Sequence, residues 1–431
     1  MVAKKHIVYL IFNEDITSAL IRRQVIELLE EIKSKAQEID ITLLAFLSPL
    51  SIVKRFSLLK KMKIDMAKKN VGLGIIPLPV PWPFPHFKFK RLDVGYRTHG
   101  YWSRWAIRIL PVFVWPVMIY YRFVLNARIF HCRSYPTASA AVRLKQLNIC
   151  PIKVIFDPRS DFPEENVTSG NWNKDDANYN FWKKLETVLL NQSDAVACIA
   201  KCYADEYKKI APRAKIFFAP NNVDCKLFAR DIDERKRLRK SLGVSDDELV
   251  FGYLGAMTSS GWHRPFLYRV LIESLLQTNI PFRFIFLVPR HSNAIIEREF
   301  KSHIEAGRVI LINPNYDEVG RYLSVCDYGV MLLHDKKNVV GTKIGEYLAS
   351  GLPIIVNENC VGAVDLIAAE CVGLVFDVQN DPINDYRLNG LEKIAVGDRL
   401  LAWSQQVSYF AVDYFDNRIV ASRYINQYND L

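Results

Sequence analysis

Short apolar runs alternate with stretches of helical spacing along nearly the whole chain, and this alternation limits most strongly what the chain can fold into. An apolar run of about four to eight residues is typical of a buried strand, and apolar residues at every third or fourth position are typical of a helix on a core. Parallel strands need a crossover, which is usually a helix. The sequence therefore predicts an α/β fold with parallel sheets.

The expected strands form two series. The first comprises residues 6–12, 41–46, 71–76, 127–131 and 153–156, with helices expected near 19–32 and 137–147. The second comprises residues 249–254, 282–288, 309–312, 328–332, 353–356 and 373–376.

Residues 216–246 separate the two series. They pass from an apolar run into the turn sequence PNNVD and then into a charged helical segment, which is typical of an interdomain connection. We expect an N-terminal domain over residues 1–220, a C-terminal domain over residues 221–400 and a last helix over residues 401–431. A length of 431 residues suits two domains.

The eight cysteines show no CxxC pair and no partnering histidine pattern. Neither a zinc site nor a disulfide framework is indicated, so we expect free thiols, no bound metal and a reducing cytoplasm. The first apolar run is too short for the hydrophobic region of a signal peptide.

The net charge of +11 is concentrated in residues 51–110, which hold thirteen Lys and Arg against two Asp. This segment also contains the aromatic sequence PWPFPHFK, and basic residues together with Trp and Phe suit an anionic membrane surface. A solvated basic face is the alternative, and nucleic acid is another, although no nucleic-acid-binding motif accompanies the charge. The apolar run 109–121 contains two prolines, and we expect it to be too short to cross a bilayer, which takes about 18–20 residues.

Residues 338–356, NVVGTKIGEYLASGLPIIV, combine groups that a nucleotide diphosphate needs. Gly341 and Thr342 can open a helix with free N–H groups, and Lys343 adds a charge beside them. Glu346 lies one turn later, where it can accept hydrogen bonds from a ribose. An ordinary surface helix before a buried strand would show the same spacing.

The same stretch resembles the donor motif P-T-K-x-x-E-Y-L-A-x-G-x-P of retaining GT-B glycosyltransferases of the family 4 type. The resemblance implies two Rossmann-like domains with an interdomain cleft, and a last helix that crosses back to the N-terminal domain. It implies that Lys343 contacts the donor phosphates and that Glu346 holds the ribose. Many members have a glutamate near the donor sugar where this chain has Asn338.

Other segments are similar to the family in the same order. Residues 254–257, LGAM, resemble the glycine loop whose N–H groups approach the phosphates, which assigns Gly255 to the donor site. Ala256 stands where the family usually has an arginine, so we expect Arg264 or Arg290 to supply the missing charge. Residues 220–224 resemble the connection into the donor domain.

The acceptor side is expected in the N-terminal domain. Residues 156–160, FDPRS, resemble a strand end whose Asp157 and Arg159 would face the cleft, although a surface ion pair fits them equally well. His131 or Arg133, at another strand end, is expected to reach the same region, with a buried histidine as the alternative. Asn13 follows the first strand, where a loop can meet an acceptor.

The resemblance implies a retaining, metal-independent transfer of a sugar from a nucleotide-sugar donor, without a further cofactor. We expect the acceptor to be a lipid-linked cell-surface glycan, and the protein to be peripheral at the inner face of the membrane. A nucleotide-sugar epimerase on the same fold and a non-catalytic subunit that binds a glycan or nucleotide are the alternatives.

Overall fold

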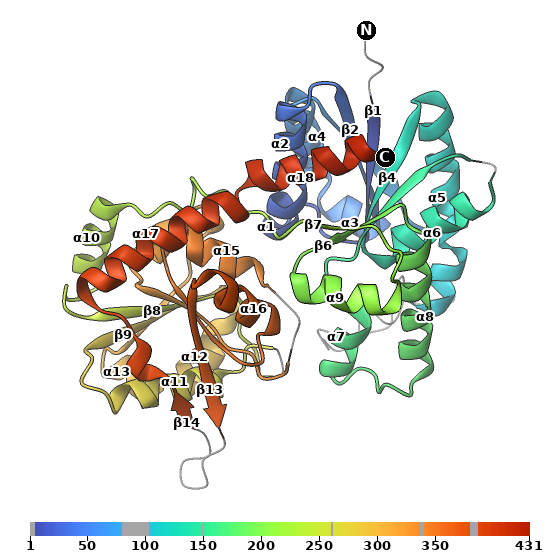
Figure 1. The fold of residues 1–431 in the computed structure, drawn as a ribbon. Coiled ribbons are helices and arrows are strands. Elements are labelled where there is room, and N and C mark those ends of the chain that lie inside the picture. Colours follow the sequence, from blue (N-terminus) through green and yellow to red (C-terminus); the bar gives the residue numbers. More distant parts are fainter. Residues whose placement is uncertain (1–4, 80–102, 149, 260–261, 337–339, 380–386) are drawn as a thin grey trace. The chain divides into compact units, whose positions relative to one another are not determined.

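The chain divides into two compact units in a computed structural model that describes residues 5–79, 103–148, 150–259, 262–336, 340–379 and 387–431. Unit 1 consists of Met1–Ala219 and Val420–Leu431, and unit 2 of Pro220–Ile419. Each unit contains one seven-stranded sheet flanked by helices (Figure 1). The predicted α/β fold with two parallel sheets is confirmed.

The sheet of unit 1 has the strand order β3-β2-β1-β4-β5-β6-β7, and all its pairings are parallel. The central strand β1 is buried along most of its length and pairs with β2 from Lys5 opposite Ile39 to Phe12 opposite Phe46. Burial on both faces explains why β1 reads as an unbroken apolar run. The strands are β1 (Lys5–Phe12), β2 (Ile39–Leu47), β3 (Val71–Pro77), β4 (Ala127–Arg133), β5 (Lys153–Asp157), β6 (Ala195–Cys198) and β7 (Ile216–Phe218).

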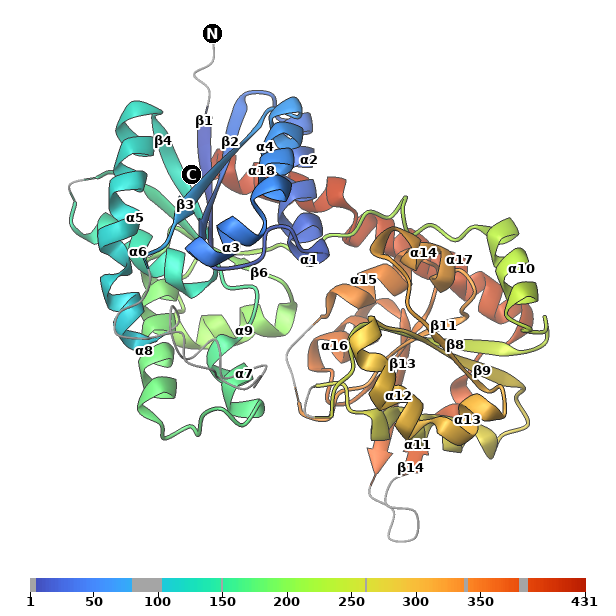
Figure 2. The same cartoon turned by 180° about the vertical axis from the view of Figure 1, so that it is seen from behind.

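The helices of unit 1 connect successive strands (Figure 2). The first helical segment changes to π-helical geometry in its middle, over Arg22–Glu27, and its apolar residues pack on β1 and β2. The helices are α1 (Ala19–Ile21), η1 (Arg22–Glu27), α2 (Leu28–Lys35), α3 (Pro49–Lys54), α4 (Phe56–Lys68), α5 (Arg104–Val124), α6 (Ser134–Gln146), α7 (Phe162–Thr168), α8 (Ala177–Gln192) and α9 (Lys201–Ile210).

Helix α5 corrects one expectation. It extends over 21 residues and includes both Pro111 and Pro116, so among the described residues one helix is long and apolar enough to span a membrane by length and composition. Within unit 1 it serves as the crossover between β3 and β4, and one face packs on α6. The Nε1 of Trp115 donates to the carbonyl of Ala140 at 2.8 Å. Only 28% of its most apolar window is buried.

The sheet of unit 2 has the order β10-β9-β8-β11-β12-β13-β14, and only the edge strand β14 is antiparallel to its neighbour. Phe251, Phe284 and Phe286 form the centre of its core with Tyr253 and Tyr268. The strands are β8 (Leu249–Leu254), β9 (Phe282–Leu287), β10 (Val309–Ile312), β11 (Tyr328–Met331), β12 (Ile354–Asn357), β13 (Gly373–Gln379) and β14 (Arg387–Asn389). The helices are α10 (Ile232–Ser241), α11 (Pro265–Leu276), η4 (Arg290–Ser292), α12 (Asn293–Glu299), α13 (Lys301–Glu305), η5 (Tyr316–Glu318), α14 (Val319–Leu323), α15 (Thr342–Ala349), α16 (Val361–Glu370), η6 (Leu391–Lys393) and α17 (Gly397–Tyr414).

The expected last helix over 401–431 is two helices, α17 and α18 (Asn417–Asp430). Helix α17 stays in unit 2, where it packs on α15. It ends at Tyr414, and Phe415 and Asp416 connect it to α18. The break is stabilised by Asp416, which forms a β-bridge with Val223 and accepts from the side chain of Arg418 at 2.7 Å. Only α18 joins unit 1, where Val420, Tyr424 and Tyr428 enter the core.

All eight cysteines are free, as expected, and Cys371 is the one exposed thiol among them.

Candidate functional site

Both sheets contain a point where the strand order reverses. In unit 2 the chain moves from β8 outward to β9 and β10, and then returns to place β11 on the other side of β8. In open α/β sheets, ligands bind beyond the carboxyl ends of the strands at such a point. The ends of β8 and β11 are therefore the place to look for a site in unit 2.

Helix α15 is fixed to this place by Tyr347. The hydroxyl of Tyr347 accepts from the backbone N–H of Leu254, at the end of β8, at 2.7 Å, and donates to the carbonyl of Val330 in β11 at 3.1 Å. Residue 329 must be glycine, because a Cβ there would lie 2.2 Å from the Cγ of Tyr347. The N-terminus of α15 is thus held beside the ends of both central strands.

Lys343, in the first turn of α15, lies in a cage of uncharged groups. Its Nζ is 2.9 Å from Nε2 of His263 and 4.5 Å from the ring centroid of Tyr253. Gly255, which has a φ of +121°, closes the cage, because a Cβ there would lie 3.1 Å from Nζ. A larger residue at 255 would strain the backbone and displace the lysine.

Burial lowers the pKa of Lys343 to about 7, against an opposing effect of Cys360. The pKa of His263 is held well below its usual range by burial and by the neighbouring lysine. Among the described residues, no carboxylate lies within ion-pair distance of Lys343. Lys343 is half-buried, so the cage holds a partly desolvated amine that an anion can stabilise as an ammonium group.

The start of α15 adds a second attraction for an anion. Its N-cap is Gly341, which has no side chain to accept from the first N–H groups, and Thr342 follows at the first helical position. The first N–H groups of a helix and its dipole favour negative charge. The predicted grouping of Gly341, Thr342 and Lys343 is present in the structure.

The other predicted donor residues differ in accessibility. Glu346 is 3% exposed, and Asn338 lies outside the described residues. Arg264 is half-buried at the N-cap of α11, and its Nε has no hydrogen-bond partner among the described residues. Arg290 is exposed and follows β9.

The glycine loop after β8 differs from its expected role. The N–H of Gly255 donates to the carbonyl of Leu287 at 3.0 Å, and the N–H of Met257 donates to Oγ of Ser292 at 3.0 Å. Ala256 is exposed, and its carbonyl accepts from Tyr253. The N–H of Gly255 thus completes the sheet edge, so it is not among the loop N–H groups that are free to approach phosphates.

In unit 1 the strand order reverses between β1 and β4, and the charges there are already paired. Asn13 follows β1 with a φ of +49°, and Glu14 accepts from Nε of Arg133, at the end of β4, at 3.1 Å. Nη2 of Arg133 donates to Gln24 at 2.8 Å. Arg133 is 4% exposed, so the expectation that it is available to a ligand is wrong.

His131 is completely buried, so it does not reach the cleft as a catalytic group, and the alternative of a buried histidine is the one that the structure shows. Its Nδ1 lies 2.7 Å from the hydroxyl of Tyr428 on α18, and its Nε2 lies 3.1 Å from Oδ2 of Asp157. Burial alone would raise the pKa of Asp157, but Arg159 and His131 lower it to about 2. Asp157 and Arg159 form a buried ion pair, with Oδ2 and Nε 2.9 Å apart.

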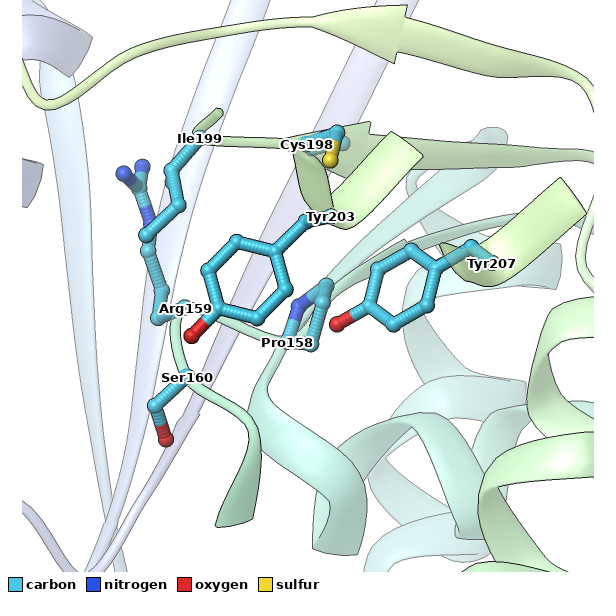
Figure 3. Close-up of a pocket in the computed structure, with 8 residues that line it drawn as sticks. Pro158, Arg159, Ser160, Cys198, Ile199, Tyr203 and Tyr207 are labelled. Atoms are coloured by element: carbon cyan, nitrogen blue, oxygen red, sulfur yellow. The ribbon is translucent and has the colours of Figure 1, made fainter. Parts of the chain in front are cut away.

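A small hollow lies beside this ion pair (Figure 3). Pro158, Arg159 and Ser160 line it from the segment after β5, and the hydroxyl groups of Tyr203 and Tyr207 on α9 point toward that segment. The two tyrosine rings are stacked, with centroids 6.0 Å apart. The hollow has no room for a water molecule, so it is a packing feature of unit 1.

Sequence reasoning missed the residues that surround Lys343. Tyr253 sits in a strand that was predicted as core, and His263 lies in a loop eight residues after Gly255. Cys360, the N-cap of α16, also faces the lysine. The signal that the sequence offered was the adjacent polar pair His263 and Arg264, in the loop after the strand predicted over 249–254.

Comparisons with known proteins agree with this architecture. No protein-family model matches the chain, and no curated protein sequence matches it. Solved structures do match over nearly the full length. They include Anabaena HepE in complex with UDP and glucose (12% identity, TM-score 0.61, 99% of both chains) and a glycosyltransferase from Rickettsia africae (14%, 0.64, 99% of this chain and 98% of that one).

A third match is WaaG, a glycosyltransferase involved in lipopolysaccharide biosynthesis, with 11% identity, a TM-score of 0.58, and coverage of 98% of this chain and 99% of that one. These neighbours are GT-B glycosyltransferases. The fold of the chain is therefore the GT-B fold, with two Rossmann-like domains. At these identities the likeness establishes the fold, and the activity is argued from the site.

Proposed function

We propose that the chain is a glycosyltransferase that transfers a sugar from a UDP-sugar to a glycan acceptor, and that unit 2 binds the donor. The observation that carries this proposal is the Lys343 amine, caged without a counter-ion among the described residues at the point where the sheet order reverses. The structural neighbour HepE was solved with UDP and glucose, which supports UDP as the nucleotide.

A donor site must stabilise the diphosphate that leaves when the sugar is transferred. Transfer of a sugar leaves negative charge on the diphosphate, and a fixed cation with helix N–H groups stabilises that charge without reorganisation. Lys343 and the start of α15 supply both, so we propose a metal-independent reaction. Retention of configuration rests on the resemblance of residues 338–356 to the family 4 donor motif.

The exposed face of α5 supports the proposal that the acceptor is a lipid-linked glycan at an anionic membrane surface. Six apolar residues and one arginine recur along this face at intervals of one to four residues, with exposed fractions of 66% for Val112 and 60% for Phe123. They are Trp105, Arg108, Val112, Pro116, Tyr120, Phe123 and Val124.

Basic residues flank this exposed face. Helix α5 contains no acidic residue and carries Arg104 and Arg122 near its ends. An apolar stripe with cationic flanks suits the headgroup region of anionic lipids, with about 1 kcal/mol gained per basic residue near the surface. The aromatic segment 81–88 and Lys88, Lys90, Arg91 and Arg97 lie outside the described residues. We propose a peripheral attachment at the inner face of the membrane.

The donor proposal is tested by titrating the protein with UDP in a calorimeter. Lys343→Met should weaken UDP binding about tenfold to a hundredfold, because a hydrogen bond to a charged group contributes about 1.5–3 kcal/mol. Lys301→Met is the matched control, since Lys301 is an exposed lysine on α13. Equal affinities in all three proteins would remove Lys343 from the site.

Turnover separates the proposal from its alternatives. A transferase releases UDP from a UDP-sugar faster when acceptor lipids extracted from membranes are added. An epimerase would interconvert UDP-sugars without any acceptor, and a non-catalytic subunit would bind UDP with no turnover. Either of these two results would overturn the proposed transfer.

The membrane proposal is tested by sedimentation with vesicles. The protein should bind phosphatidylglycerol-containing vesicles more tightly than pure phosphatidylcholine, and Val112→Asp with Phe123→Asp should abolish binding. Leu401→Asp, at a residue of α17 that is 59% exposed, is the control and should bind like the wild type. Tighter binding to duplex DNA than to anionic vesicles would contradict the proposal.

A further inference from the structure

The cage around Lys343 contains a histidine whose protonation is fixed by its neighbours. Nδ1 of His263 lies 3.1 Å from the carbonyl oxygen of Leu332, just after β11. A carbonyl can only accept, so Nδ1 carries the proton. Nε2 faces Lys343 at 2.9 Å, where a second N–H would meet the donors of the ammonium group. His263 is therefore neutral, and its Nε2 accepts from Lys343.

We propose that His263 is a positioning residue, whose neutral ring holds the Lys343 ammonium group at the ends of β8 and β11 so that it meets the diphosphate of the donor. This inference rests on the proposed function. A free lysine side chain loses rotamer entropy when a ligand fixes it, and a lysine that is already held in place has lost most of that freedom before the ligand binds.

The position of His263 is itself well defined. The hydroxyl of Tyr268 lies 3.3 Å from Nδ1 of His263 and accepts from the N–H of Leu332 at 3.2 Å. The ring of Tyr253 packs edge-on against that of His263, with ring centroids 5.4 Å apart, and also makes a cation–π contact with Nζ of Lys343. Hydrogen bonding thus fixes the imidazole at the carboxyl end of the sheet, and the imidazole in turn is hydrogen-bonded to Lys343.

The titratable groups that face Lys343 come from three elements. They are His263 from the loop before α11, Tyr253 from β8 and Cys360 from the start of α16. His263 is the acceptor among them that bonds directly to Nζ. Without it, the ammonium form of Lys343 would lose a hydrogen bond while remaining desolvated, so the lysine would lose its proton at a lower pH.

Two substitutions of His263 each keep one of its two hydrogen bonds, to Leu332 or to Lys343. In His263→Asn the amide can still donate to Leu332 but is too short to reach Lys343. In His263→Gln the longer side chain can place its amide oxygen where Nε2 stood and accept from Lys343. His303→Asn, on α13, is the matched control outside the cage.

The test is a UDP titration of each protein between pH 6 and pH 9, with thermal unfolding measured without UDP to confirm folding. His263→Asn should raise the Kd for UDP about tenfold at pH 7, the usual effect of one lost hydrogen bond to a charged group. The pH at which affinity begins to fall should also move lower in this variant. His263→Gln should restore most of the affinity and a profile close to the wild type.

The outcomes that overturn the inference are distinct from those that overturn the function. If the wild type binds UDP and Lys343→Met does not, while His263→Asn keeps the wild-type affinity and pH profile, the function stands and the positioning role is wrong. Equal weakening by Asn and Gln at every pH would show a merely structural role. If the wild type binds no UDP at any pH, the proposed donor site fails and the inference fails with it.

Discussion

Each unit places a basic side chain where its strand order reverses, and the two side chains have different partners. In unit 1 the arginine at this point is neutralised within the unit, because Arg133 is paired with Glu14 and bound to Gln24. In unit 2 the cation at the equivalent point is Lys343, which contacts a neutral imidazole and an aromatic ring.

The partners of the two side chains decide how each would respond to an anion. A paired arginine has little left to gain from a phosphate, whereas a desolvated amine gains its proton and a partner together. The same sheet architecture thus provides a closed ion pair in one unit and the proposed anion site in the other.

The largest loss of stability from a single substitution is expected for Arg133→Met in unit 1. Removing one partner of a buried ion pair leaves Glu14 without its counter-ion, and such changes destabilise proteins by about 3–5 kcal/mol. Because Glu14 is partly exposed, we expect the lower end, about 3 kcal/mol, measured by urea unfolding. The Kd for UDP, measured on the folded protein, should stay at the wild-type value. A variant that loses UDP binding while keeping its stability would reverse the roles of the two units.

A smaller effect is expected from Gly255→Ala in unit 2. The φ of +121° is strained for alanine and costs about 1–3 kcal/mol, and the new Cβ would also meet Nζ of Lys343. Stability and UDP affinity should both fall. Gly243→Ala separates the two causes, since Gly243 also has a positive φ of +66° but nothing within 4 Å of an added Cβ. This control should lose stability and keep its UDP affinity.

The next effect is on the pH dependence of binding. The pKa of Lys343 is about 7 in the free protein, and a bound diphosphate raises it. UDP affinity should therefore be nearly constant below pH 7 and fall above it, by at most about tenfold per pH unit. In Lys343→Met the fall in UDP affinity above pH 7 should be absent. An affinity for wild type that is flat from pH 6 to pH 9 would contradict the lowered pKa.

The last effect is the pH dependence of stability without ligand. Lys343 has a lower pKa folded, about 7, than its ordinary value of 10.5, so between these values the unfolded chain binds a proton that the folded chain does not. Wild-type stability should therefore rise from pH 7 to pH 10.5 relative to Lys343→Met. Chemical unfolding at several pH values measures the difference. Relative stability that falls over this range would have the wrong sign.

The sequence allowed the sheets to be predicted because their strands are buried and uniformly apolar. The run 249–254 became β8 without change, and the run 6–12 became β1 with one residue added. Helix α5 was underestimated because Pro111 and Pro116 normally end helices, and here both are accommodated inside one. The break at Asp416 depends on Val223, which is distant in sequence and could not be seen as a partner.

The site was predictable only in part, for the same reason. Lys343 and Gly341 stand out because they share one short segment at a helix start. His131 was misjudged because its partner Tyr428 lies 297 residues away, on a helix whose destination the local pattern does not show. The role of His263 depends on a loop that meets α15 from 80 residues away, and no spacing rule connects such positions.

The most direct test of the central claim is a crystal structure of the protein with UDP bound. The diphosphate should lie at the start of α15, with an oxygen within hydrogen-bond distance of Nζ of Lys343 and with Nε2 of His263 still in contact with that lysine. A diphosphate bound away from α15, with Lys343 in the same cage as without the ligand, would contradict the account.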